Sequence, residues 1–254
     1  NFYLEEDADK DVILRDVRNA LEELRTFMDI GEGTIEESQT EDKDWINNWK
    51  EFFHQFYVDD ILIVPSWEEI KEEDKDKMIL HIDPGTAFGT GMHETTQLVI
   101  RQLKKYVKPG IALLDVGTGS GILGITALKL GAGHVVGTDL DPCAVPAVQD
   151  NKEANQIVDD TFDMMIGNII DDKEVQDQVG YEKYDIVAAN ILADVLVPLT
   201  PVIVHQMKKG AYYITSGILD VKEEVVKEAV QKAGLTLVEV TRQGEWVCVT
   251  ARKD

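Results

Sequence analysis

The glycine-rich stretch Asp115-Val116-Gly117-Thr118-Gly119-Ser120-Gly121 is the most informative segment of this 254-residue chain. It follows an apolar run, 111–116, and precedes a helical pattern, 122–130, so we expect it to turn the chain from a strand into a helix. Glycines in such a turn let a ligand approach the backbone, and the free N–H groups of the following helix attract anions. Asp139 ends the next predicted strand, where its carboxylate can accept hydrogen bonds from two ribose hydroxyls. The stretch therefore predicts a nucleoside ligand at the carboxyl edge of a parallel sheet.

Strand and helix patterns alternate downstream of this loop, which indicates parallel strands joined by right-handed helical crossovers. The last two strands are separated only by a short turn and must be antiparallel. We therefore predict an α/β fold with a doubly wound, mostly parallel seven-stranded sheet and a C-terminal antiparallel hairpin. The expected strands after the first are 135–139, 164–167, 185–189, 211–215, 235–241 and 246–251, and the expected helices are 144–155, 191–208 and 221–233.

The charge and the pattern differ upstream of residue 77. Residues 1–77 hold 24 acidic and nine basic side chains, whereas residues 78–254 hold 24 and 16. We expect residues 1–43, with a strand at 2–4 and a helix at 12–27, to be the remnant of a small α+β N-terminal domain whose first part is missing, because the chain starts with Asn. We interpret residues 44–77 as a linker with an aromatic helix at 45–56, a strand near 61–64 and a solvated acidic run at 68–76, and residues 78–254 as the α/β domain.

Composition limits the possible partners and compartment. There are 25 basic and 48 acidic residues, a formal net charge of −23, which argues against direct binding to nucleic acid and favours small molecules or basic proteins. Only Cys143 and Cys248 are present, so we expect neither a disulfide framework nor a metal site, and a reducing cytoplasm is the default. No secretory signal is visible, and the apolar stretch 186–204 contains two prolines, so we interpret it as a buried strand and helix rather than a membrane span. We expect a monomer.

Two further segments carry candidate site residues. Asn190 ends the strand 185–189, which should lie beside the glycine-loop strand, and its carboxamide could orient an incoming amine or cap the next helix. The loop from Asp83 to Thr96 is rich in glycine and hydroxyl groups and is typical of a lid rather than of a core. Within it, His93 is a candidate site residue, and Thr95 or Thr96 could cap the helix that follows.

The identity of the nucleoside is open on pattern alone. Gly119, Gly121 and Gly124 satisfy the literal dinucleotide fingerprint, so an NAD-dependent oxidoreductase is the alternative. Three features favour S-adenosylmethionine instead: the acidic Asp115, the additional Gly117 and the antiparallel hairpin that ends the sheet. A non-catalytic adaptor that keeps the fold is a third possibility.

The sequence resembles the PrmA family, the bacterial methyltransferases of ribosomal large-subunit protein eleven. The resemblance begins at Asp44-Trp45, continues through Trp49-Lys50 and 63–68, is most specific over Asp83–Thr96, and ends at Glu245-Trp246. It implies a class I S-adenosylmethionine-dependent methyltransferase that methylates lysine side chains and the N-terminal amine of a basic ribosomal protein. Residues 1–43 would then be the end of that family's substrate-recognition domain.

The resemblance also implies site residues. Cofactor contacts are expected at Thr96, Gly117, Asp139 and Asn190, with Phe88, His93, Thr95 and Gly119 lining the same pocket. The stretch 190–193 reads Asn-Ile-Leu-Ala and departs from the Asn-Pro-Pro-Tyr of enzymes that methylate adenine or glutamine amides, which favours an aliphatic amine as the nucleophile. Asn190 is the expected catalytic residue, because its amide could orient that amine.

Overall fold

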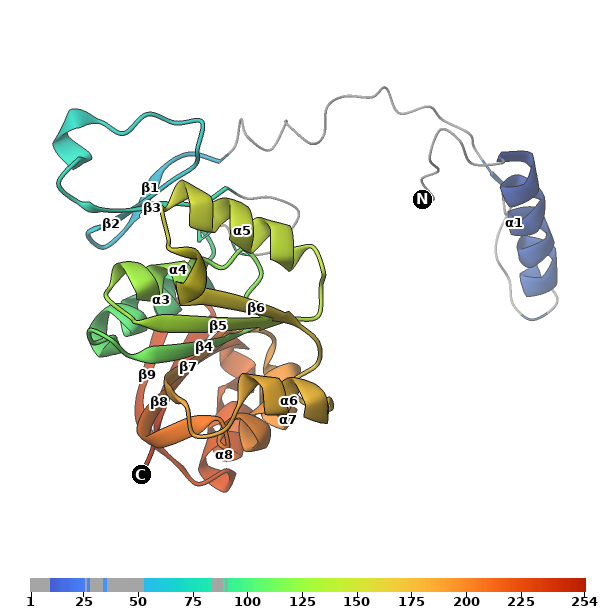
Figure 1. Ribbon diagram of the computed structural model, residues 1–254. Coiled ribbons are helices and arrows are strands. Elements are labelled where there is room, and N and C mark those ends of the chain that lie inside the picture. The colour runs from blue at the N-terminus through green and yellow to red at the C-terminus, as the bar shows by residue number, and fades with distance from the viewer. Residues whose placement is uncertain (1–9, 26, 28–33, 36–52, 84–88, 90) are drawn as a thin grey trace. The chain divides into compact units, whose positions relative to one another are not determined.

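A computed structural model describes residues 10–25, 27, 34–35, 53–83, 89 and 91–254 (Figure 1). The chain forms two compact units, 1–48 and 49–254. In the first, the helix α1 (Lys10–Arg25) confirms the helical pattern expected at 12–27, and it ends two residues earlier than predicted. The strand expected at 2–4 and most of the aromatic helix expected at 45–56 lie outside the described residues. The assignment of residues 1–43 to a partial substrate-recognition domain stays a prediction.

A three-stranded sheet opens the described part of the second unit. It consists of β1 (Phe56–Val58), β2 (Ile61–Val64) and β3 (Met78–His81) in that order, with β1–β2 antiparallel and β2–β3 parallel. Phe56 was expected on a helix and is instead a strand residue, because it pairs with Ile63 across the β1–β2 ladder. The acidic run holds a short 3-10 turn, Glu72–Asp74. This small sheet packs through its apolar side chains into the same core as α3 (Glu94–Tyr106) and α4 (Ile122–Lys129).

The main sheet has seven strands in the order β6-β5-β4-β7-β8-β10-β9 (Figure 1). The first five are parallel, and β10 runs antiparallel to both β8 and β9, as the sequence predicted. The bounds are β4 (Ala112–Val116), β5 (His134–Asp139), β6 (Phe162–Ile166), β7 (Tyr184–Asn190), β8 (Met207–Leu219), β9 (Leu235–Gln243) and β10 (Trp246–Lys253).

Helices cover both faces of this sheet (Figure 1). On one face lie α3, α4 and α5 (Ala144–Ala154); on the other lie α6 (Lys173–Val179), α7 (Ala193–Ile203) and α8 (Glu223–Lys232). Successive side chains of β4 pack on opposite faces of the sheet. Leu113 belongs to the core formed with α3 and α4, Leu114 belongs to the core formed with α7 and α8, and both are fully buried. The predicted doubly wound fold is therefore confirmed, and every parallel strand directs its carboxyl end to the same edge.

Several element boundaries differ from the prediction for non-local reasons. The helix expected at 191–208 ends at Ile203, and β8 is 13 residues long rather than spanning 211–215. The extra length of β8 is paired, since Leu219 lies opposite Trp246 of β10, a partner that local pattern does not reveal. The seven-residue α6 was not expected, because its mostly polar sequence carries little periodic signal.

Within the described ranges, no helix combines the length and apolar character that crossing a bilayer requires. The stretch 186–204 accordingly forms most of β7 and all of α7, as expected.

Candidate functional site

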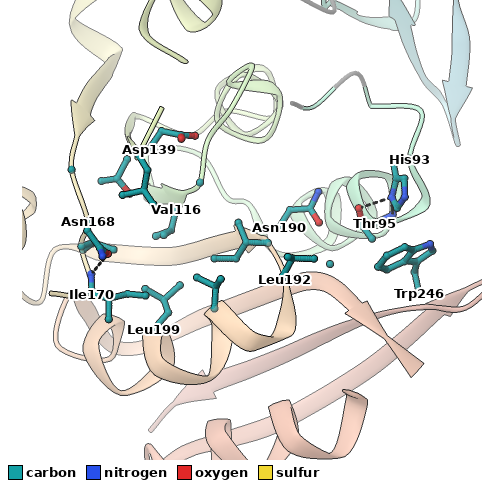
Figure 2. Close-up of a pocket in the computed structure, with 18 residues that line it drawn as sticks. His93, Thr95, Val116, Asp139, Asn168, Ile170, Asn190, Leu192, Leu199 and Trp246 are labelled. Atoms are coloured by element: carbon teal, nitrogen blue, oxygen red, sulfur yellow. Dashed lines mark hydrogen bonds between the residues drawn. The ribbon is translucent and has the colours of Figure 1, made fainter. Parts of the chain in front are cut away.

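A cavity of about 540 Å³ opens at the carboxyl ends of β4, β5 and β7 (Figure 2). This size is in the usual range of small-molecule sites, and the position is where open α/β sheets bind ligands. The described residues that line it are His93, Thr95, Val116, Gly117, Thr138, Asp139, Leu140, Gly167, Asn168, Ile169, Ile170, Asn190, Ile191, Leu192, Val195, Leu199, Gly217 and Trp246.

The glycine loop borders the cavity through Gly117. Gly117 has a φ of 71°, and a Cβ built there would lie 2.6 Å from Cγ2 of Ile191, so only glycine fits without a shift. The backbone N–H groups of Gly117 and Thr118 donate to the carbonyl of Thr138 at 2.8 and 3.1 Å. The loop is thereby fastened to the end of β5 with room for a ligand against its backbone.

Asp115 shapes this loop from the inside. Its carboxylate is fully buried, and Oδ2 accepts hydrogen bonds from Thr118 Oγ1 at 2.7 Å and from the Gly124 N–H at 3.2 Å. Oδ1 has no hydrogen-bond partner among the described residues. Burial raises the pKa of Asp115 to about 7, against the lowering effect of its two hydrogen bonds, and the negative charge of Asp139 adds to the rise. Asp115 is therefore a structural acid rather than a ligand contact.

Asp139 extends from the end of β5 into the cavity (Figure 2). Oδ2 accepts from the backbone N–H of Gly119 at 2.8 Å, and Oδ1 accepts from that of Asp141 at 3.0 Å. Each carboxylate oxygen can accept a second hydrogen bond, so two hydroxyl donors can still be received. The geometry fits the vicinal hydroxyls of a ribose.

Asn190 ends β7 at the middle of the cavity wall (Figure 2). Its Nδ2 donates to Thr96 Oγ1 at 3.0 Å, whereas its Oδ1 is buried without a hydrogen-bond partner among the described residues. The alternative that Asn190 caps the next helix is wrong, because the cap position of α7 is Leu192. A buried, unused carbonyl oxygen is costly unless a ligand supplies its donor.

The N-terminus of α3 forms the other end of the cavity. His93 is its N-cap, with Nδ1 accepting from the Thr95 N–H at 3.3 Å and lying 2.9 Å from Thr95 Oγ1. The expectation that Thr95 or Thr96 provides the cap is therefore wrong, since both lie in the first helical turn. The His93 ring meets Trp246 edge-on, with ring centres 4.8 Å apart, and both side chains border the cavity (Figure 2).

The opposite end of the cavity is apolar with polar edges. Leu140 is 67% exposed although it lines the cavity, and Ile169 and Ile170 follow β6. The side chain of Asn168 accepts from the Ile170 N–H at 3.0 Å, which holds this turn in place. A flat, largely apolar ring system would bury itself well here.

The predicted site residues fall into two rows. His93, Thr95, Gly117, Asp139 and Asn190 border the cavity. Gly119 and Thr96 do not border the cavity but contact residues that do. The Gly119 N–H donates to Asp139, and Thr96 Oγ1 accepts from Asn190. Phe88 lies outside the described residues.

Sequence reasoning missed several parts of the lining: Leu140, the turn 168–170, Trp246, and also Val195 and Leu199 of α7 and Gly217 of β8. The first two directly follow strands whose carboxyl ends face the site, a signal that could have identified them. Trp246 follows the hairpin turn and gave no such signal.

This fold is shared with S-adenosylmethionine-dependent methyltransferases. A putative enzyme of that class from Streptococcus mutans superposes with a TM-score of 0.56 over 68% of this chain and 52% of its own, at 13% identity, which shows the fold alone. A ribosomal protein L11 methylase from Lactobacillus delbrueckii subsp. bulgaricus matches with a TM-score of 0.71 and 31% identity, over 80% of this chain and 100% of its own.

The chain belongs to the ribosomal protein L11 methyltransferase family (PrmA), whose family model matches residues 1–254. Ribosomal protein L11 methyltransferases of Lachnospira eligens and Agathobacter rectalis are 58% and 55% identical, and each alignment covers 100% of this chain and 80% of the relative. The resemblance noted in the sequence is confirmed. The comparisons do not support the nicotinamide oxidoreductase suggested by Gly119, Gly121 and Gly124, because the matching family and the Lactobacillus delbrueckii structure are both methyltransferases.

Proposed function

We propose that this chain transfers methyl groups from S-adenosylmethionine to amino groups of ribosomal protein L11, on lysine side chains and the N-terminal amine. The relatives carry that substrate in their names. Asn190 supports it best: this residue borders the cavity between the Asp139 end and the Trp246 end, and its buried carbonyl oxygen has no hydrogen-bond partner among the described residues (Figure 2).

The residues around the cavity fit the cofactor. We assign the ribose hydroxyls to Asp139, the close backbone approach to Gly117, and the adenine to the apolar end formed by Leu140 and Ile169. His93 and Thr95 would border the methionine end, Gly119 would act through its hydrogen bond to Asp139, and Phe88 stays a proposed pocket residue. When bound, S-adenosylmethionine supplies an electrophilic methyl group on a sulfonium.

The chain's own residues would prepare the amine. A lysine ammonium, with an ordinary pKa of about 10.4, has no lone pair and must lose a proton before it can attack. The apolar side chains that line the cavity disfavour the charged form and so lower the pKa of an amine that enters it. Asn190 Oδ1 would then accept one N–H of the neutral amine and hold its lone pair towards the methyl group.

The charge of the chain suits a basic protein substrate. With a net charge of −23, it attracts a positively charged partner over a distance set by the ionic strength. The rate of methyl transfer to L11 at low substrate concentration should therefore fall as salt is added. A rate that does not depend on salt would contradict docking by charge.

The direct test uses purified chain, methyl-labelled S-adenosylmethionine and two acceptors, ribosomal protein L11 and a lysine peptide taken from it. We expect label on primary amines, read by mass spectrometry, and none on L11 whose amines have been acetylated. Asn190→Ala should lose most turnover at saturating cofactor, while Asn190→Asp, which keeps an acceptor oxygen, should lose less. Full turnover by Asn190→Ala would refute the orienting role, and label on acetylated L11 would refute amines as the target.

A further inference from the structure

A buried hydrogen bond joins the glycine loop to the segment that leads into α3. Ser120 Oγ donates to the carbonyl oxygen of Gly89 at 2.6 Å, and both residues are buried. Ser120 belongs to the loop that brings Gly117 to the cavity, whereas Gly89 lies shortly before His93, which caps α3 and borders the same cavity. The hydrogen bond therefore connects two parts of the cavity wall that come from separate stretches of the chain.

Ser120 is itself held from its other side by α5. Its backbone carbonyl accepts from Nδ2 of Asn151 at 2.9 Å, and Asn151 is 1% exposed. Oδ1 of the same Asn151 accepts from the backbone N–H of Asp83 at 2.9 Å. Neither Ser120 nor Asn151 lines the cavity. Their side chains are thus used to hold backbone segments in place rather than to meet a ligand.

The segment before α3 rests directly on the glycine loop and on the start of α4. A Cβ built on Gly89 would lie 2.8 Å from Ser120 Oγ, and one built on Gly91 would lie 2.7 Å from Cδ1 of Ile122. Such close approach leaves no room for a side chain at either glycine. The position of this segment is therefore set by what it touches on the glycine-loop side, and Ser120 supplies the hydrogen bond in that contact.

We propose that Ser120 is a positioning residue, which sets the spacing between the part of the cavity that holds the adenosine and the part that holds the amino-acid tail of the cofactor. This inference rests on the cofactor placement proposed above, with the adenosine beside Asp139 and the tail beside His93 and Thr95. A ligand that meets both parts binds with full affinity only when they are already correctly spaced, because otherwise binding has to order the segment. A ligand that meets only the adenosine part gains nothing from this spacing.

Two ligands of related structure distinguish this role from a general effect on the fold. S-adenosylhomocysteine contains the adenosine and the amino-acid tail, whereas 5′-methylthioadenosine keeps the adenosine and the sulfur but lacks the tail. Calorimetry gives the Kd of each ligand, and thermal unfolding checks that each variant is folded.

Ser120→Ala should weaken the binding of the longer ligand alone. We expect the Kd of S-adenosylhomocysteine to rise about fivefold, because binding must then order a segment that one hydrogen bond had held, and the Kd of 5′-methylthioadenosine to stay within about twofold of wild type. An equal rise for both ligands would overturn the proposal, since Ser120 would then only shape the glycine loop. Two unchanged Kd values would overturn it as well.

Thr126→Val is the matched control. Thr126 is a fully buried residue of α4, and its Oγ1 donates to the Ile122 carbonyl within the same helix at 2.6 Å. Valine therefore removes one buried hydroxyl of the same kind without removing a link to the segment before α3. Both Kd values should stay within about twofold of wild type. A rise confined to S-adenosylhomocysteine would overturn the proposal, because any disturbance of α4 would then have the same effect.

Gly89→Ala tests the same contact from its other side. The added Cβ would lie 2.8 Å from Ser120 Oγ at a φ of 114°, so the segment must shift away from the glycine loop. S-adenosylhomocysteine should again lose affinity and 5′-methylthioadenosine should not. This variant decides the question if Ser120→Ala does not fold, and an equal effect on both ligands would contradict the spacing role.

Failure of the proposed function is seen separately, because neither Kd depends on methyl transfer. If wild type binds both ligands but methylates no amine of L11, the proposed substrate is refuted and the comparison of ligands still decides the role of Ser120. If wild type binds neither ligand, the cofactor placement is wrong and the inference about Ser120 is overturned with it.

Discussion

The buried carboxyl group of Asp115 should make the stability of this protein depend on pH, and Asp115→Asn should remove that dependence. Asparagine keeps an oxygen for the bonds from Thr118 and Gly124, and its NH₂ group replaces the carboxylate oxygen that has no partner among the described residues. The glycine loop should therefore keep its shape. Only the ionisation is removed.

The size of the effect follows from the pKa of Asp115, which burial raises to about 7 in the folded protein. In the unfolded chain an aspartate titrates near 3.9, so the folded state binds the proton more tightly. Stability from this group is then fully present below the unfolded pKa and is lost as pH rises through the folded pKa, at about 1.4 kcal/mol per unit between the two. From about pH 5.5 to about pH 8.5, wild type should lose about 2 kcal/mol relative to Asp115→Asn.

The assay is urea unfolding followed by tryptophan fluorescence at both pH values, with equal m-values as the condition for comparison. Other carboxylates titrate in both proteins, so their contributions cancel in the difference. Asp150→Asn, an exposed change on α5, is the control and should show no such difference. If the gap between wild type and Asp115→Asn moves by less than about 0.5 kcal/mol between the two pH values, the burial argument is refuted.

Three further substitutions test the site. Gly217→Ala places a Cβ 2.3 Å from the carbonyl oxygen of Ile191 at a φ of 83°, so the free energy of unfolding should fall by about 2 kcal/mol or more. The control is Gly234→Ala, where φ is also positive but the Cβ meets open space, and it should cost about 1 kcal/mol. Equal losses would contradict the close approach. Asp139→Asn should raise the Kd of S-adenosylhomocysteine about tenfold by calorimetry, and an unchanged Kd would exclude the ribose contact. Trp246→Leu should lower kcat/KM for the amine about threefold to tenfold, because the edge contact with the His93 ring is lost. Trp246→Phe keeps an aromatic ring and should retain most of the wild-type kcat/KM. Similar values for both variants would rule out a role for the ring.

Local pattern determined the class of fold and the centre of the site. Strand and helix signals alternate because each parallel strand must be followed by a covering helix, and these signals require no knowledge of distant partners. Gly117 and Asp139 could be assigned for the same reason, since residues that directly follow parallel strands must meet at one edge of the sheet. Asn190 was found in this way, although the pattern left open whether it served a ligand or a helix cap.

Only the tertiary structure decided which side chains face the ligand and which stand behind them. Thr96 is separated from Asn190 by 94 positions, and their hydrogen bond exists because α3 packs beside β7. The full length of β8 and the place of Trp246 likewise depend on pairing with β10, which local periodicity cannot reveal. Periodicity tells which face of an element is buried, whereas the partner on that face is chosen by packing and pairing across the whole chain.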